Sequence, residues 1–480
     1  MPRRLINLIM QVAAGERVTA NDPRVRQGNV AGFSGQVARA VMVLLASCLA
    51  MLGIGMNSTA IMAALPTMRS DFGLGEIGTQ WTINAYLVVS ASCIVLGGKA
   101  ADLFGARLVS MAGLALFGVA SCIIALASDE AALLAGRALQ GFSAAFAVPS
   151  TLAAVGTSAA TERRAASIGA WSGSLMLGFS IGPLFGGLLT HYVDWRVIFW
   201  LNIPLMLTAF AGLAAVRLTP AHRDATSGRT VDWKGFVLLA TAMVSMVLAL
   251  QALPQAVSAP LTVIGPLVLA AAAFAALLFV EQRAAAPLVE LSFFVRRNFL
   301  LGVSLGAISM FGIMSLLLYF NLYAQDKVGL GLTALQSGAA ILPLSATLLV
   351  LALSVSTVTA RVGLRRAMTG CMGLLVVASA IIGVAASEAG IRLMEIGFVV
   401  MGAGLALPYA AAPRLALSAL SQEQAGQGSG IINACTFLAG SVGVAAGAIA
   451  WHFAGFPGVL AMIALAGACG VAFARGVVDL

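Results

Sequence analysis

The chain has 480 residues, of which 60% are hydrophobic and only 9% are charged, and its formal net charge is +9. A soluble domain carries about 25% charged residues, because its surface must be wetted by water. The composition excludes a soluble globular protein of this size and predicts an integral membrane protein.

The apolar segments predict membrane helices rather than barrel strands. They run without interruption for about twenty residues, the length that a helix needs to cross about 30 Å of hydrocarbon, whereas barrel strands alternate apolar and polar residues. In chain order, the runs between charged breaks predict fourteen helices, at 39–66, 80–98, 108–127, 132–155, 167–190, 197–216, 235–253, 261–280, 298–323, 334–358, 367–386, 394–412, 427–450 and 457–475.

Lysine and arginine are distributed unevenly over the predicted loops. With a cytoplasmic N-terminus, 22 of the 27 basic residues lie in cytoplasmic segments and four lie in outer loops. This positive-inside bias predicts that both termini are cytoplasmic and accounts for the net charge without nucleic acid. Residues 3–12 predict either a short interfacial amphipathic helix or an irregular tail, and the polar stretch after them argues against a cleaved signal peptide.

A charged stretch, LGGKAADLFGARLVS, joins the second and third predicted helices. A similar stretch, VTARVGLRRAM, joins the tenth and eleventh, where Gly363 and Arg365 repeat the spacing of Gly105 and Arg107. The offset from Gly105 to Gly363 is 258 residues, or eight helices. An echo of one half of a chain in the other is typical of secondary transporters.

These motifs resemble those of the major facilitator superfamily. Gly98, Asp102, Gly105 and Arg107 resemble its loop motif, G-x-L-a-D-R-x-G-r-R. LLAGRALQGFSAAFAVPS resembles the helix 4 motif, and GFSIGPLFGG the helix 5 motif characteristic of exporters. The segments DWRVIFWLNIPL, QWTINAYLV, PLVELSFFVRRNF and AGQGSGIIN resemble the fourteen-helix drug:proton antiporter branch.

The resemblance implies an all-α integral membrane fold of two six-helix bundles plus two inserted helices. The expected organisation is a cytoplasmic tail at 1–38, an N-terminal bundle at 39–216, linkers and inserted helices 7 and 8 at 217–297, and a C-terminal bundle at 298–480. It also implies alternating access, in which Asp102 and the basic residues latch the two halves on the cytoplasmic side. Leu103 replaces the usual arginine and Ala360 the aspartate of the second copy, so a weaker latch is expected.

Arg137 is the one charged side chain that the prediction places inside the bilayer, away from the ends of a span. A charge there costs about 2.5–3.5 kcal/mol on insertion scales, so it should face a polar cavity or a partner, and Gln140 lies one turn away. The resemblance links this arginine to proton transfer or to shaping the cavity; the alternative is a structural pairing. In the fifth helix, Gly178, Gly182, Pro183, Gly186 and Gly187 favour close packing and a bend. The resemblance adds a gate between the halves.

Asn57 lies where the family pattern L-D-x-T-x-V-N-V-A-L-P has an aspartate. An asparagine does not ionise, so it either donates to a substrate or bonds a neighbouring helix. None of the 18 acidic residues falls near a predicted midplane, which leaves the peripheral Asp102, Asp194 and Glu395 as candidates for proton coupling.

Several polar or aromatic side chains are expected to line a mostly apolar cavity. The principal candidates are Asn57, Asn84, Tyr86, Tyr319, Asn321, Tyr409, Asn433 and Phe437. Such a cavity suits a neutral or amphipathic substrate. The six cysteines lie singly in apolar runs and the three histidines are scattered, so neither a metal site nor a disulfide is predicted.

The sequence therefore predicts a plasma-membrane transporter that exports hydrophobic or amphipathic small molecules, driven by protons. The alternative is a dedicated metabolite transporter with weak or no proton coupling, in either direction. A membrane enzyme is disfavoured because no ordered nucleophile and base are present. No cofactor or nucleotide is expected, since GxxxxGK[ST] is absent. The expected partners are the substrate, protons and membrane lipid.

Overall fold

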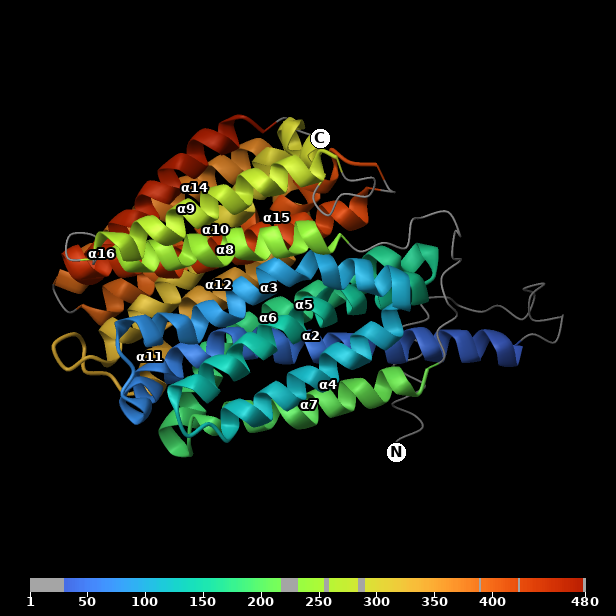
Figure 1. Cartoon of the computed structure of the whole chain (residues 1–480), viewed down its shortest axis with the longest axis horizontal. Coiled ribbons are helices and arrows are strands. Elements are labelled where there is room, and N and C mark those ends of the chain that lie inside the picture. Colours follow the sequence, from blue (N-terminus) through green and yellow to red (C-terminus); the bar gives the residue numbers. More distant parts are fainter. Residues whose placement is uncertain are drawn as a thin grey trace.

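The computed structural model describes residues 30–216, 232–253, 259–283, 290–387, 390–421 and 424–477, and its regular elements are all helical (Figure 1). The predicted segment 3–12 lies outside these ranges. The helices are α2 (Val30–Phe72), α3 (Glu76–Phe104), α4 (Ala106–Ala125), α5 (Glu130–Ser158), η1 (Thr161–Arg163), α6 (Arg164–Tyr192), α7 (Arg196–Ala214), α8 (Trp233–Ala252), α9 (Pro260–Glu281), η3 (Leu291–Val295), α10 (Arg297–Gln325), α11 (Ala334–Ala340), α12 (Leu342–Leu353), α13 (Val355–Val362), α14 (Leu364–Ser387), α15 (Ile391–Leu417) and α16 (Ala425–Arg475).

Thirteen helical segments of the described chain are long and apolar enough to cross a membrane. The difference from the fourteen expected spans lies in α16, which has 51 residues and is interrupted at Ala454 and Gly455. Gly455 has φ 59° and ψ −150°, a conformation accessible chiefly to glycine. This break falls between the predicted spans 427–450 and 457–475, so α16 provides the length of both.

The predicted helix at 334–358 is divided into three pieces. The chain leaves regular helical geometry at Ile341 and again at Ser354, which has φ −94° and ψ 3°. Pro343 lies in the first turn of α12, where a missing N–H costs no intrahelical bond. The apolar pattern predicted the span but not its two interruptions.

The helices form two groups that meet along a seam. Helices α2 to α7 pack mainly against one another, as do α10 to α16, and the groups meet where α2 and α6 contact α10, α11 and α12 and where α3 contacts α16. Figure 1 shows the blue-to-green group and the yellow-to-red group on opposite sides. The pair α8 and α9 lies along the seam, because α8 contacts both α3 and α16.

The two similar charged stretches of the sequence also share a backbone conformation. Gly105, between α3 and α4, has φ 92° and ψ 134°, and Gly363, between α13 and α14, has φ 86° and ψ 145°. Each donates its N–H to the carbonyl four residues earlier, at Ala101 and Thr359. The two charged stretches therefore form the same tight turn between two helices. We call this end of the bundle the Gly105 end, and the opposite end, with the turn at Gly73, the Gly73 end.

Candidate functional site

Arg137 is fully buried in α5 and lies in a polar environment within the first group of helices. Its Nε donates to the carbonyl of Thr82 at 2.8 Å and its Nη1 to Oε1 of Gln140 at 2.7 Å. The guanidinium also lies 4.7 Å from the ring centroid of Tyr86. A carbonyl dipole, an amide and an aromatic face therefore stabilise the buried cation. Neither of the two ion pairs found in the described chain involves Arg137.

Asn57 extends this arrangement to two further helices. Its Nδ2 donates to Oε1 of Gln140 at 3.4 Å, and its Oδ1 accepts from Nδ2 of Asn202 at 2.8 Å. Gln140 in turn donates from Nε2 to Oγ of Ser121 at 2.9 Å. Of the two roles considered for Asn57, the structure places its amide in bonds between helices. We call Asn57, Ser121, Arg137, Gln140 and Asn202 the arginine network.

Ser121 and Asn202 are members of the network that the sequence did not single out. Asn202 lies within the quoted motif DWRVIFWLNIPL, and it is the only asparagine in α7. A buried asparagine in an apolar helix needs a partner, which is the signal that points to it. Ser121 carries no such signal, because serines are common in these helices.

The glycines of α6 have two different neighbours. A Cβ on Gly178, Gly182 or Gly186 would collide with α2, for example with the carbonyl oxygen of Ala60 at Gly186. A Cβ on Gly187 would instead collide with the carbonyl oxygen of Ala334 in α11. Three glycines therefore allow α6 to pack closely on α2 of its own group, and the fourth permits contact with the opposite group.

Pro183 lies at the same contact between the groups. A Cβ on Gly338 of α11 would be 2.5 Å from the carbonyl oxygen of Pro183, so the two backbones approach closely from both sides. Gln325 of α10 adds a hydrogen bond from Nε2 to the carbonyl of Ala63, at 2.9 Å. The groups are thus held together at the Gly73 end.

The loop motif lies at the Gly105 end, and its residues do not contact a common partner. Arg107 donates to the carbonyls of Leu213 and Ala214, at 2.9 and 2.6 Å, and so caps the last turn of α7. Asp102 is exposed near the end of α3 and is not part of an ion pair within the described chain. A Cβ on Gly98 would lie 3.9 Å from the Cβ of Pro149. In this conformation Arg107 contacts its own group, not the opposite one.

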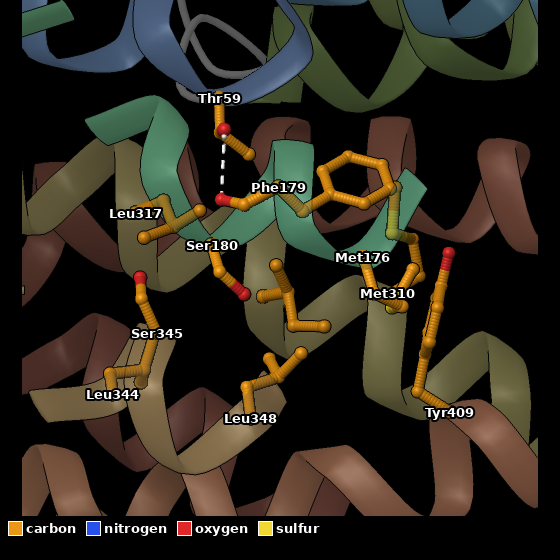
Figure 2. A pocket seen from close by; sticks show the side chains of 11 residues that line it. Thr59, Met176, Phe179, Ser180, Met310, Leu317, Leu344, Ser345, Leu348 and Tyr409 are labelled. Atoms are coloured by element: carbon orange, nitrogen blue, oxygen red, sulfur yellow. Dashed lines mark hydrogen bonds between the residues drawn. The ribbon is translucent and has the colours of Figure 1, made fainter. Parts of the chain in front are cut away.

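A small cavity lies between the groups, bordered by α2, α6, α10, α12 and α15 (Figure 2). Its volume is about 20 Å³, which is room for about one water molecule, whereas ligand pockets measure about 300–1,000 Å³. Its lining is formed mostly by apolar side chains, with three hydroxyl-bearing residues and one tyrosine: Thr59, Met176, Phe179, Ser180, Met310, Ile313, Leu317, Leu344, Ser345, Leu348 and Tyr409.

Tyr409 is the one residue of the predicted cavity set that lines this cavity. Tyr319 donates to the carbonyl of Val444 at 2.7 Å, and Asn433 donates to the carbonyl of Ser429 at 2.9 Å. Asn321 accepts from Ser337 at 2.8 Å. These three polar groups therefore serve contacts within and between helices in this conformation.

Two aromatic members of the set meet across the seam. The rings of Tyr86 and Phe437 lie 6.5 Å apart, edge to face, and join α3 to α16. The hydroxyl of Ser58 donates to that of Tyr86 at 3.2 Å. Asn84, on the same helix as Tyr86, accepts from Ser441 of α16 at 2.8 Å.

Two packed groups of membrane-length helices, an internal repeat and a small cavity between the groups define a polytopic membrane protein. A match to the Major Facilitator Superfamily extends over residues 44–444. The chain belongs to this family.

The chain is also similar to individual proteins that are named for resistance or export. It is 32% identical to the tetracenomycin C resistance and export protein of Streptomyces glaucescens, over 69% of this chain and 61% of that protein. It is 35% identical to the puromycin resistance protein pur8 of Streptomyces alboniger, over 63% and 59%. The multidrug resistance protein Stp of Mycobacterium tuberculosis (strain CDC 1551 / Oshkosh) is 29% identical, over 84% and 74%. The chain thus spans about 60% of the length of the first two relatives.

A solved structure with the same fold is the crystal structure of an auto-inhibited POT family peptide transporter. Its TM-score is 0.64 at 16% identity, and the match covers 91% of this chain and 97% of that chain. At this identity the likeness concerns the fold alone.

Proposed function

We propose that the protein exports hydrophobic or amphipathic small molecules across the cell membrane by alternating access, driven by protons. The observation that carries the proposal is the cavity of Figure 2, which lies between the two groups of helices and is mostly apolar. The names of two relatives add support, since they describe resistance to puromycin and export of tetracenomycin C.

The proposed transport cycle separates residues 39–216 and 298–480 as two bundles, with 217–297 as a connecting and inserted segment. With about 20 Å³ available, the cavity is too small for a drug-sized molecule, so the bundles must move apart to admit one. At the Gly73 end, opening must separate α6 from α11 at Gly187 and Pro183. A second, polar cavity of about 380 Å³ lies beside this contact, bordered by Gln325 and His191, and it offers a route for release.

The proposed orientation places the Gly105 end and both termini in the cytoplasm. It rests on the 22 basic residues assigned to cytoplasmic segments against four in outer loops. In this orientation the contact between α6 and α11 is the outer gate. The loop with Gly98, Asp102, Gly105 and Arg107 then controls the inner gate, and the exposed carboxylate of Asp102 is available to the opposite bundle.

Proton coupling is proposed to act through the arginine network and the peripheral acids. Arg137 is buried and depends on Thr82 and Gln140 for its hydrogen bonds, so movement of α3 against α5 would change its stability as a cation. Asp194 pairs with Arg196 at 3.8 Å at the Gly73 end, and Glu395 is half-buried near the start of α15.

One observation favours a second candidate, a dedicated metabolite transporter with weak or no proton coupling. Both ends of the Asn57 amide are engaged by Gln140 and Asn202, and the position carries no ionisable group. A site without a central acid suits a neutral substrate as well as it suits a drug.

The test uses purified protein in liposomes loaded with cationic, neutral and anionic dyes, with and without an imposed pH gradient. Gradient-dependent movement of cationic or amphipathic dyes is the expected result, and protein-free liposomes are the control. Movement that is confined to one class of neutral or anionic compound and indifferent to pH would favour the metabolite transporter. No movement of any dye would refute multidrug export.

A further inference from the structure

The inserted helix α8 carries a buried amide without a partner. Gln251 lies near the end of α8 and is only 5% exposed, yet neither its Nε2 nor its Oε1 has a hydrogen-bond partner among the described residues. A buried amide group without a hydrogen-bond partner is costly in a membrane, because water does not supply the missing hydrogen bond. Gln251 therefore indicates either a neighbouring polar group or a bound ligand.

The register of α3 and α8 brings Gln251 to the same level of the bundle as Asn84, which forms a polar pair with Ser441 of α16. The hydroxyl of Ser92 in α3 contacts the sulfur of Met243 in α8 at 3.5 Å, and the two helices run in opposite directions (Figure 1). Asn84 lies eight residues before Ser92 in α3, and Gln251 lies eight residues after Met243 in α8. Both steps are about 12 Å toward the Gly73 end, and residues eight apart share a helix face.

The polar pair itself is incompletely satisfied. Asn84 is fully buried, and its Oδ1 accepts from Ser441 of α16, but its Nδ2 has no partner among the described residues. One turn away, Gln80 is 8% exposed and its Oε1 also lacks a partner within the described chain. Hydrogen-bond donors and acceptors that lack partners among the described residues therefore occur together where α3, α8 and α16 meet.

We propose that Gln80, Asn84, Gln251 and Ser441 form a ligand site, which we call the amide site. It takes a neutral group that both donates and accepts hydrogen bonds, because its side chains offer both functions and none of them is charged. Ordered water and a hydroxyl or amide group of a transported molecule have this chemistry. The second source rests on the proposed export function.

The amide site gives the inserted helices a role beyond spacing. Helix α8, which carries Gln251, contacts α3 of one group and α16 of the other. The inserted pair thereby completes a polar site on the seam, separate from the cavity bordered by α2, α6, α10, α12 and α15.

The test compares the variant Gln251→Leu with the wild type, and Ser245→Ala serves as a control that removes a buried hydroxyl from another turn of α8. Transport in liposomes is measured with a hydroxymethyl coumarin and its O-methyl ether, and thermal unfolding with the purified protein. Radiolytic hydroxyl labelling of Leu87, which is buried one turn from Asn84, reports water next to the site.

If a substrate hydroxyl binds, Gln251→Leu raises the half-saturating concentration of the hydroxymethyl coumarin by about five- to tenfold and leaves the ether unchanged. If water is the ligand, labelling of Leu87 falls at least about fivefold in Gln251→Leu, and addition of the coumarin does not protect it in the wild type. In both cases the unfolding temperature stays equal or rises, because an unfilled amide has been removed.

A lower unfolding temperature with unchanged labelling and unchanged transport would overturn the proposal, since the amides would then only bond one another. Absence of all coumarin transport by the wild type would refute the export function instead. The labelling and the unfolding temperature would still decide whether the amide site holds water.

Discussion

The arginine network makes a definite prediction for Arg137→Met, which removes the charge and keeps an unbranched apolar side chain. Two hydrogen bonds from the cation are lost, to the carbonyl of Thr82 and to Gln140. Bonds of this kind contribute about 1.5–3 kcal/mol each, or about 3–6 together, while burying an arginine in a membrane costs about 2.5–3.5 kcal/mol. The variant should therefore lose only about 0–3 kcal/mol of stability.

Transport should respond far more strongly than stability. We expect Arg137→Met to reach the membrane and unfold within a few degrees of the wild type. Its dye export should fall at least about tenfold, equivalent to about 1.4 kcal/mol. Arg137→Lys is the matched control, because it keeps a charge but lacks the planar fork that serves Thr82 and Gln140 together, and it should retain partial transport. Dye export in liposomes and thermal unfolding in detergent measure the two effects. Unchanged export by Arg137→Met would remove this arginine from the mechanism.

Three further predictions concern the network and the two gates. Asn57→Asp should increase the export of cationic dyes several-fold in the liposome assay, because a carboxylate attracts cations, and equal export would show that a charge at this position in the arginine network does not act on the transported cation. The leucine of Gly187→Leu should collide with α11 and hinder closure at the Gly73 end. The closed conformation should be destabilised by about 1–3 kcal/mol. A cysteine introduced at Ser345 in a background without native cysteines should then react faster with an impermeant maleimide from outside, and an unchanged rate would argue against the gate. Asp102→Asn should slow transport several-fold without altering thermal unfolding, since the side chain is exposed; a wild-type rate would exclude a latch role.

The sequence predicts the membrane class and the spans well, because apolar runs of about twenty residues are required by the bilayer itself. It also identifies the repeat at Gly105 and Gly363, which the structure confirms as the same positive-φ turn. The interruption at Ile341 could not be read from the apolar pattern, since apolar residues continue through it. The serines and threonines from Ser354 onward are common in membrane helices and do not mark a break by themselves. Such breaks depend on packing against neighbouring helices rather than on composition.

The candidate site was predicted less completely than the fold. Arg137 stands out as a lone charge, and Gln140 is found because it lies one turn away. Ser121 and Asn202 come from α4 and α7, so only the tertiary packing brings them to Gln140 and Asn57. The cavity lining is mostly leucine, methionine and phenylalanine, and nothing in the sequence separates these from ordinary membrane packing.

The arginine network and the cavity lie in different places, and α2 joins them. Asn57 bonds the network, whereas Thr59, two residues on and so on the opposite face of the helix, donates to the carbonyl of Phe179 at 3.0 Å and lines the cavity. Tyr86 makes a second link, because its ring faces Arg137 and also contacts Phe437 of the opposite group. Arg137 is therefore connected to the contact between the groups through Tyr86, and to the cavity lining through Gln140, Asn57 and α2. The proposed proton coupling through Arg137 would thus have a path to the cavity through packed, directly bonded elements, and it would need no carboxylate at position 57.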